Sequence, residues 1–317
     1  MDRIDLIKTT KAYQSVADDY YKQRLPNCNL LISPDLMSRQ AFALAFANLV
    51  ICEDKNEATM RNIAKKVHPD VFFLPKGDGL KVEDVEIILD KIYYFPMEAN
   101  VKVFVLEDFS SATTQAQNKL LKTLEDTPNN VYFLLSSAKD DGILRTVKSR
   151  CRRLDLDPLS EQVLEIFMAG YSVNAKTIEI AKCFGRREMG RTDFMLTNAV
   201  VGELVDLAFA IIKNCKTSGN LLQYAVELMK YKDKLELFLQ IYSDTLEKML
   251  RMQILDEKND FVKLDFDSLK NELSTDAILT LLTRIARLAE MLARACYTTA
   301  IIDDLLIETC KCANMKS

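Results

Sequence analysis

The chain has 317 residues, enough for two or three domains. Hydrophobic residues make up 49 % and charged residues 28 %, a balance typical of globular proteins that bury a core. The net charge of -4 at pH 7 excludes a basic field that would draw the whole molecule onto nucleic acid. We expect a cytoplasmic protein, because residues 1–5 are too polar for a signal peptide and the longest apolar stretch, 41–52, is shorter than the ~20 residues of a membrane helix.

The eight cysteines and the single histidine predict neither a disulfide framework nor a metal site. No two cysteines form a Cys-x-x-Cys pair, so we expect reduced thiols that lie mostly in the core. His68 lacks the partners that a zinc site requires, and we expect its role to be structural. The sequence therefore predicts no bound zinc.

Between residues 30 and 135, short apolar runs alternate with amphipathic stretches in which apolar residues recur every three or four positions. Thr114 and Gln117 have the spacing of a capping box at the start of the last of these stretches. The expected strands are 30–32, 71–74, 101–106 and 131–135, and the expected helices are 39–51, 81–93 and one that runs from 114 to just before Pro128. This alternation predicts an α/β fold with a parallel sheet flanked by helices.

From residue 160 onward we expect helices only. The run Thr217–Asn220 is the best linker candidate in the chain. The expected helices are 161–168, 175–184, 195–214, 221–255 and 277–310. We therefore predict an α/β domain at 1–159, a small helical domain at 160–216 and a second helical domain at 217–317.

The junction 33–40, between the first predicted strand and its helix, occupies the place of a phosphate-binding loop. A working loop reads Gly-x-x-x-x-Gly-Lys-Ser/Thr, so that backbone N–H groups surround the phosphates and the lysine contacts the outer ones. Here the two glycines, the lysine and the hydroxyl are replaced, in that order, by Ser33, Ser38, Arg39 and Gln40. Pro34 removes an N–H donor and Asp35 adds a negative charge. We predict a degenerate loop that holds no ATP, with weak binding through Arg39 as the alternative.

Glu107 and Asp108 follow the predicted strand 101–106. At this place an ATPase carries an Asp for Mg²⁺ and a Glu that orients the attacking water. The order is reversed here, and the bulky Phe109 follows. With the phosphate loop eroded as well, we expect no catalysis by this pair.

The run Thr146–Cys151 follows the last predicted strand of the first half. An arginine presented to a neighbouring subunit can stabilise the charge that develops on a transferred phosphate. Arg150 is flanked by the small residues Ser149 and Cys151, which would let a partner approach closely. The residues alone leave this role open against a solvated basic surface, because further basic residues surround it: Arg145, Lys148, Arg152 and Arg153.

Two motifs in this half are highly specific, the run Asn118–Glu125 (Asn-x-Leu-Leu-Lys-x-Leu-Glu) and Ser149-Arg150-Cys151. Further matching runs are His68-Pro69-Asp70, Val103 to Asp108, Phe133 to Ser137 and Gly190-Arg191. Together the runs before residue 160 resemble the AAA+ domain of bacterial clamp-loader subunits of DNA polymerase III. Gly190-Arg191 resembles part of the lid of the same subunits. Many members of that family insert a four-cysteine zinc module before the His-Pro-Asp run, whereas segment 53–67 holds no cysteine.

The resemblance implies an AAA+ domain, a helical lid and a helical collar within a pentameric complex. In this family the ATP-hydrolysing tau/gamma subunits keep the full phosphate motif and the delta subunit lacks Ser-Arg-Cys. A chain with Ser-Arg-Cys and an eroded loop is thus expected to lack its own ATPase and to supply Arg150 to a neighbouring tau/gamma subunit.

The implied partners are tau/gamma and delta subunits and, through the complex, the sliding clamp and primed DNA. Two alternatives remain at this point. The chain could hydrolyse ATP itself, with Arg39 in place of the lysine, or it could be a scaffold in which Arg150 only shapes an interface.

Overall fold

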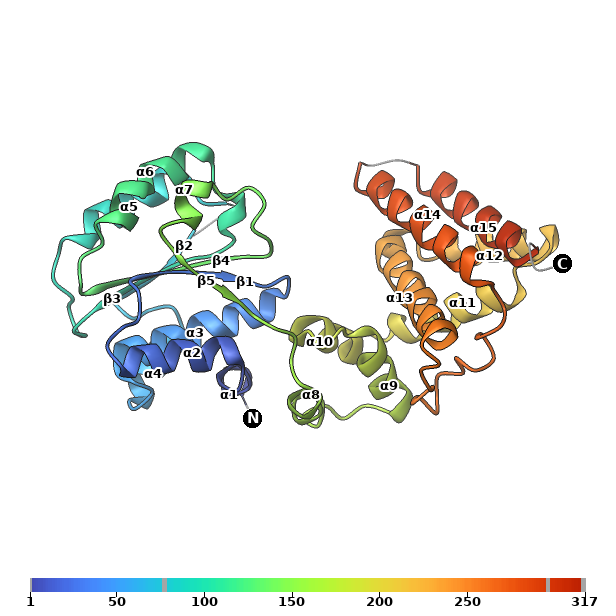
Figure 1. Ribbon diagram of the computed structural model, residues 1–317, viewed down its shortest axis with the longest axis horizontal. Coiled ribbons are helices and arrows are strands. Elements are labelled where there is room, and N and C mark those ends of the chain that lie inside the picture. The colour runs from blue at the N-terminus through green and yellow to red at the C-terminus, as the bar shows by residue number, and fades with distance from the viewer. Residues whose placement is uncertain (1, 76–78, 295–296, 315–317) are drawn as a thin grey trace. The chain divides into compact units, whose positions relative to one another are not determined.

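The computed structural model describes residues 2–75, 79–294 and 297–314 (Figure 1). These residues form two compact units. The first consists of Met1–Gly170 with Arg187–Arg191, and the second of Tyr171–Arg186 with Thr192–Ser317. The sites that the sequence predicts all lie in the first unit.

The first unit is built on a parallel five-stranded sheet in the order β2-β3-β4-β1-β5. The strands are β1 (Cys28–Ile32), β2 (Val71–Leu74), β3 (Lys102–Leu106), β4 (Val131–Ser137) and β5 (Arg152–Asp155). Parallel neighbours need crossover connections, which place helices on both faces of the sheet. The predicted fold class, a parallel sheet flanked by helices and followed by an all-helical region, is confirmed.

Helices cover both faces of this sheet (Figure 1). One face carries α3 (Leu36–Cys52), which packs on β3 and β4 and is covered in turn by α1 (Arg3–Lys8), α2 (Lys11–Tyr21) and α4 (Glu57–Ala64). Because α3 is enclosed in this way, it is apolar on almost every side. The other face carries α5 (Val82–Ile92), α6 (Thr114–Glu125) and the short α7 (Arg145–Lys148).

The core of the first unit contains a stack of three phenylalanines on neighbouring strands. Phe72, Phe104 and Phe133 are in register on β2, β3 and β4. Their ring centroids lie 4.9 Å and 5.2 Å apart along the stack. Such aromatic contacts add to the area that the rings bury, so this stack helps to fix the register that aligns the carboxyl ends of the strands.

After α8 (Glu161–Met168) the chain enters the second unit, which has only helices among its described residues. They are α9 (Ala175–Phe184), most of α10 (Met189–Thr197), α11 (Val200–Asn214), α12 (Ser218–Met229), α13 (Leu235–Ile254), α14 (Thr275–Ala293) and α15 (Thr298–Asn314). Helices α13, α14 and α15 pack in sequence order. The buried face of α14 includes Leu281, Ile285 and Leu288.

Several elements of the first unit differ from the prediction. Strand β5 is missed because Arg152 and Arg153 break the apolar pattern, and helices α1, α2 and α4 are missed as well. Thr114 does not cap α6. The preceding Thr113 is the N-cap, with its Oγ1 accepting a hydrogen bond from the N–H of Ala116 at 3.1 Å.

In the second unit each of the three long predicted helices is broken. The 195–214 stretch divides at 198–199, the 221–255 stretch at 230–234, and the 277–310 stretch after Ala293. The predicted linker Thr217–Asn220 is the start of α12, and Thr217 caps that helix by accepting from the N–H of Asn220. Polar residues that cap a helix and residues that form a linker look alike in a sequence.

Candidate functional site

A hollow of about 360 Å³ opens at the carboxyl ends of the parallel strands, where open α/β sheets bind their ligands. It brings together the eroded phosphate loop and the acidic pair, as their places in the sheet predict. Its lining residues are Leu36, Arg39, Gln40, Pro75, Gly79, Glu107, Asp108 and Ser136.

Asp35 places a carboxylate at the N-terminus of α3, where a phosphate would bind in a working loop. This side chain is only 7 % exposed. Its Oδ2 accepts the N–H of Ser38 at 3.0 Å and also the Ser38 hydroxyl. Its Oδ1 accepts the N–H of Gly190 at 3.0 Å. A Cβ at position 190 would overlap this oxygen, so only glycine permits the contact. The helix N-terminus is therefore already satisfied by an anion of the protein itself.

Arg39 turns back onto the loop that precedes it. Its Nη1 donates to the carbonyl of Ser33 and, at 3.2 Å, to the carbonyl of Pro34. The residue is 6 % exposed, and burial lowers the pKa of its guanidinium in spite of the carboxylates of Asp108, Asp35 and Glu107 nearby. Arg39 thus braces the loop through two of its backbone carbonyls.

The acidic pair is divided between two environments. Glu107 is half-buried and accepts from Nζ of Lys66, which lies 3.3 Å from each of its carboxylate oxygens. Asp108 is exposed and has a positive φ of 48°. It precedes a 3₁₀ turn, Phe109–Ser111, whose Phe109 is fully buried. Lys66 was not expected at this site, because no motif in the sequence marks it.

Arg150 lies just after α7, and its guanidinium is held by two neighbours. Nε and Nη2 donate to Oε2 of Glu125, the last residue of α6, at 3.2 Å and 2.8 Å. Nη1 donates to the carbonyl of Thr146 at 3.0 Å. The side chain is 30 % exposed, so a partner molecule can reach it. Glu125 was part of the quoted motif, but its pairing with Arg150 was not predicted.

Two of the basic residues around Arg150, Arg152 and Arg153, form ion pairs within the chain. Arg152 contacts Asp19 at 2.7 Å, and Arg153 contacts Asp140 at 2.7 Å and Asp155 at 2.9 Å. The side chains of Arg153, Asp140 and Asp155 are exposed enough for water to screen these pairs. Arg152 and Arg153 are thus held by carboxylates of the same chain.

The two small residues that flank Arg150 lie in different environments. Ser149 is exposed, but Cys151 is 9 % exposed and belongs to the hydrophobic core. Burial raises the pKa of the Cys151 thiol to about 12. Cys151 packs in the core that also contains Cys28 and Leu30 of β1.

The His-Pro-Asp run has a structural role. His68 is buried, and its Nδ1 accepts the N–H of Asp70 at 3.2 Å. The carboxylate of Asp70 is fully buried and accepts three backbone N–H groups, from Met97, Glu98 and Ala99, at 2.7–2.9 Å. Asp70 therefore fixes the connection between α5 and β3.

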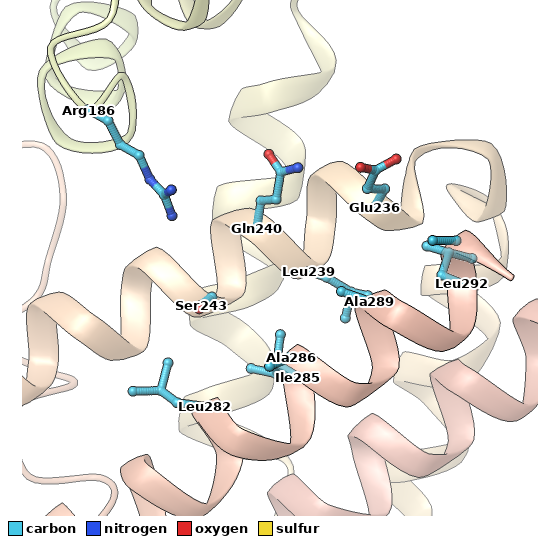
Figure 2. A pocket seen from close by; sticks show the side chains of 11 residues that line it. Arg186, Glu236, Leu239, Gln240, Ser243, Leu282, Ile285, Ala286, Ala289 and Leu292 are labelled. Carbon is cyan, nitrogen blue, oxygen red and sulfur yellow. The ribbon is translucent and has the colours of Figure 1, made fainter. Parts of the chain in front are cut away.

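A second hollow, of about 260 Å³, lies in the second unit between α13 and α14 (Figure 2). Its floor is made of aliphatic side chains such as Leu239 and Ile285, while Arg186 and Gln240 stand on its rim. Arg186 pairs with Asp244 of α13. Because most of this lining is apolar and its one arginine is paired with Asp244, we assign the candidate site to the first unit.

Within the described ranges, no group of three or more His, Cys, Asp and Glu side chains could hold a metal ion. The predicted absence of zinc remains a prediction, which elemental analysis of the chelator-washed protein can check.

Among the residues that the structure describes, no single helix is long and apolar enough to cross a bilayer. The pair α10 and α11 passes that criterion together but is bent by 91°.

Comparison with known proteins matches residues 8–160 to the family model of the DNA polymerase III delta subunit. The gamma subunit of DNA polymerase III from Buchnera aphidicola is 32 % identical over 108 residues, which are 34 % of this chain and 30 % of the relative. The delta' subunit from Yersinia pestis is 38 % identical over 87 residues, 26 % of each protein. The aligned part thus spans less than a third of these relatives. A solved gamma subunit-related protein from Thermotoga maritima covers 98 % of this chain and 100 % of its own at 17 % identity, with a TM-score of 0.45, too low to compare details.

The matched range includes the eroded loop, the acidic pair and Arg150. The matches are named as delta, gamma and delta' subunits of DNA polymerase III. They agree on this complex, but each names a different subunit of it. The family-level resemblance predicted from the motifs is confirmed. Residues 8–160 match the model of the DNA polymerase III delta subunit, and parts of the chain are similar to subunits of this polymerase named gamma and delta'.

Proposed function

We propose that this chain is a delta prime-type subunit of the DNA polymerase III clamp loader. It hydrolyses no ATP itself and supplies Arg150 to the ATP site of a neighbouring tau/gamma-type subunit. In this proposal residues 1–159 form an AAA+ domain, 160–216 a lid and 217–317 a collar that joins the subunits. Its partners are tau/gamma and delta subunits, and the assembled complex acts on the sliding clamp and primed DNA.

The observation that carries the proposal is the carboxylate of Asp35 at the N-terminus of α3. The partial positive charge of a helix N-terminus and its N–H groups normally favour phosphate. Here Asp35 takes the N–H groups of Ser38 and Gly190, and its negative charge repels an incoming polyphosphate. Arg39, the substitute for the lysine, is bonded to its own loop. Nucleotide would have to displace all of these contacts.

In the proposed mechanism Arg150 acts on a phosphate that another subunit binds. A guanidinium near the transferred phosphate stabilises the charge that builds up in the transition state, and this contribution can reach ~10³-fold or more. The position of Arg150 after α7, at the surface of the first unit, supports this role. The chain then acts as an electrostatic catalyst in trans.

The first test is calorimetry of the isolated chain with ATP and Mg²⁺. We expect no binding in the micromolar range. Low-micromolar binding would contradict the proposal and make Arg39 a phosphate ligand.

The second test compares complexes reconstituted from a P-loop-bearing gamma-type partner and either the wild-type chain or its Arg150→Ala variant. We expect the DNA- and clamp-stimulated ATP hydrolysis of the complex to fall, while assembly is retained. Arg153→Ala is the control, because Arg153 is a nearby exposed arginine whose partners lie within the chain. Unchanged hydrolysis with Arg150→Ala would leave only the scaffold role.

A second candidate function is ATP hydrolysis by this chain. It is favoured by the hollow in which Arg39, Glu107 and Asp108 still meet, and by the similarity to subunits named gamma. ATP turnover by the pure chain that is lost on Glu107→Gln would support it over the delta prime-type role.

A further inference from the structure

We propose that Glu125 is a positioning residue for Arg150. It holds one edge of the guanidinium so that the remaining N–H groups are presented to a phosphate of the neighbouring subunit. This inference rests on the proposed function, and it adds to it a residue whose part in the reaction is indirect. Both residues lie in the first unit, on α6 and just after α7.

The hydrogen bonds leave part of the guanidinium available. An arginine has five N–H donors in a planar fork. Oε2 of Glu125 accepts from Nε and from Nη2, and the carbonyl of Thr146 accepts from Nη1. Three donors are used in this way, and one N–H remains on Nη1 and one on Nη2. Two N–H groups on the two terminal nitrogens are the pair that binds phosphate oxygens in a bidentate manner.

The position of Glu125 is unfavourable for α6 itself. The residue is the last of this helix, where the C-terminal end of the helix dipole disfavours a negative charge. Asp126, which follows, adds a second negative charge at the same end. A negative charge at a helix C-terminus is expected only where another interaction offsets its cost, and for Glu125 that interaction is the pair with Arg150.

The pair is also too exposed to be explained as a stabilising contact. The side chains of Arg150 and Glu125 are 30 % and 60 % exposed. Salt bridges with such exposure contribute little to folding, because water screens them and ordering two long side chains costs entropy. The same contact can still matter for catalysis, because a pre-ordered guanidinium loses less freedom when the phosphate arrives.

The experiment is a double-mutant cycle in the reconstituted complex, with four chains: wild type, Glu125→Ala, Arg150→Ala and the double variant. We expect Glu125→Ala to lower ATP hydrolysis by about three- to tenfold, less than Arg150→Ala does. In the Arg150→Ala background the second substitution should have no further effect. Glu125→Gln, which keeps a carbonyl acceptor without the charge, should restore part of the activity. Asp126→Ala is the matched control and should behave as wild type.

The outcomes separate this inference from the proposed function. If Arg150→Ala lowers hydrolysis and Glu125→Ala does not, the positioning role is overturned and the proposed function stands. If Glu125→Ala raises hydrolysis, or lowers it equally in both backgrounds, Glu125 is an inhibitory or a merely structural residue and the inference fails. If Arg150→Ala has no effect, both ideas fall.

A measurement on the isolated chain tests the contact without any partner. The Nε–H of Arg150 should be detectable by NMR as a slowly exchanging, shifted resonance in the wild-type chain. Glu125→Ala should bring its exchange rate and chemical shift to those of an exposed arginine, with the rest of the spectrum unchanged. An unaltered Nε–H signal in that variant would overturn the positioning role.

Discussion

Arg39 and Arg150 stand at the two places where a nucleotide-binding subunit uses positive charge, and their environments are opposite. Arg39 is 6 % exposed and donates to carbonyls of its own loop. Arg150 has a side chain that is 30 % exposed and is held by Glu125 and by the carbonyl of Thr146. The first arginine completes the interior of a loop, whereas the second remains accessible to another molecule.

The difference follows from what surrounds each guanidinium. Beside Arg39, the carboxylate of Asp35 lies at the N-terminus of α3. The guanidinium of Arg39 donates to the carbonyls of Ser33 and Pro34, which need donors, and so its contacts are made within the fold. Arg150 lies between the end of α7 at Lys148 and the start of β5 at Arg152, its side chain is partly exposed, and its partners do not use all of its donors. An arginine becomes available for catalysis in trans when the fold leaves part of its fork unpaired.

The largest expected effect is that of Arg150→Lys on the complex. We expect DNA- and clamp-stimulated ATP hydrolysis to fall about tenfold or more at the neighbouring site, because an ammonium cannot replace the planar fork. Steady-state hydrolysis by reconstituted complexes measures this, with Arg152→Lys as the control. Activity equal to that of the wild type would mean that only charge, and not the geometry of the fork, is required at position 150.

Arg39→Ala should affect folding instead of activity. We expect the free energy of unfolding to fall by about 2 kcal/mol, because the buried carbonyl of Ser33 and the partly buried carbonyl of Pro34 lose a charged donor. Urea unfolding followed by circular dichroism measures the change. The exposed Arg145→Ala should stay within about 0.5 kcal/mol of the wild type. A stable Arg39→Ala variant would show that the loop does not depend on this brace.

Asp35→Ala should lower the free energy of unfolding by about 1–2 kcal/mol, because α3 loses its N-cap and Gly190 loses its acceptor. Asp35→Asn should cost less than half of that, since asparagine is also a good N-cap. The same urea experiment, with the exposed Asp141→Ala as control, tests this prediction. Equal losses for the two variants would mean that the charge of Asp35, and not its capping geometry, stabilises the loop.

The smallest expected effect concerns the neighbour of Arg150. Burial raises the pKa of the Cys151 thiol to about 12, so at pH 8 only about 10⁻⁴ of it is thiolate. Iodoacetamide should therefore leave Cys151 unmodified in the native chain while the half-buried Cys310 reacts, as peptide mass spectrometry can show. Rapid labelling of Cys151 would place this residue at the surface together with Arg150.

The sequence by itself determined the fold class and the positions of the first four strands along the chain. Their apolar runs are nearly continuous, as in strands that are covered on both faces. This pattern can be recognised without knowing which side chains pack together. The eroded loop follows β1 and the acidic pair follows β3, as the pattern predicted, whereas the short α7 before Ser149 was not predicted. Local spacing is enough for such assignments, because the chain connectivity of a parallel sheet brings the carboxyl ends of its strands to one edge.

Only the tertiary structure decided the partners of these residues. That Asp35 reaches Gly190, 155 positions away, and that Glu125 reaches Arg150 depends on contacts between distant segments. Strand β5 and the breaks in the long C-terminal helices were likewise invisible in local patterns. A charged side chain can brace its own loop or face a partner, and burial and long-range hydrogen bonds, which exist only in the folded chain, determine which role Arg39 and Arg150 take.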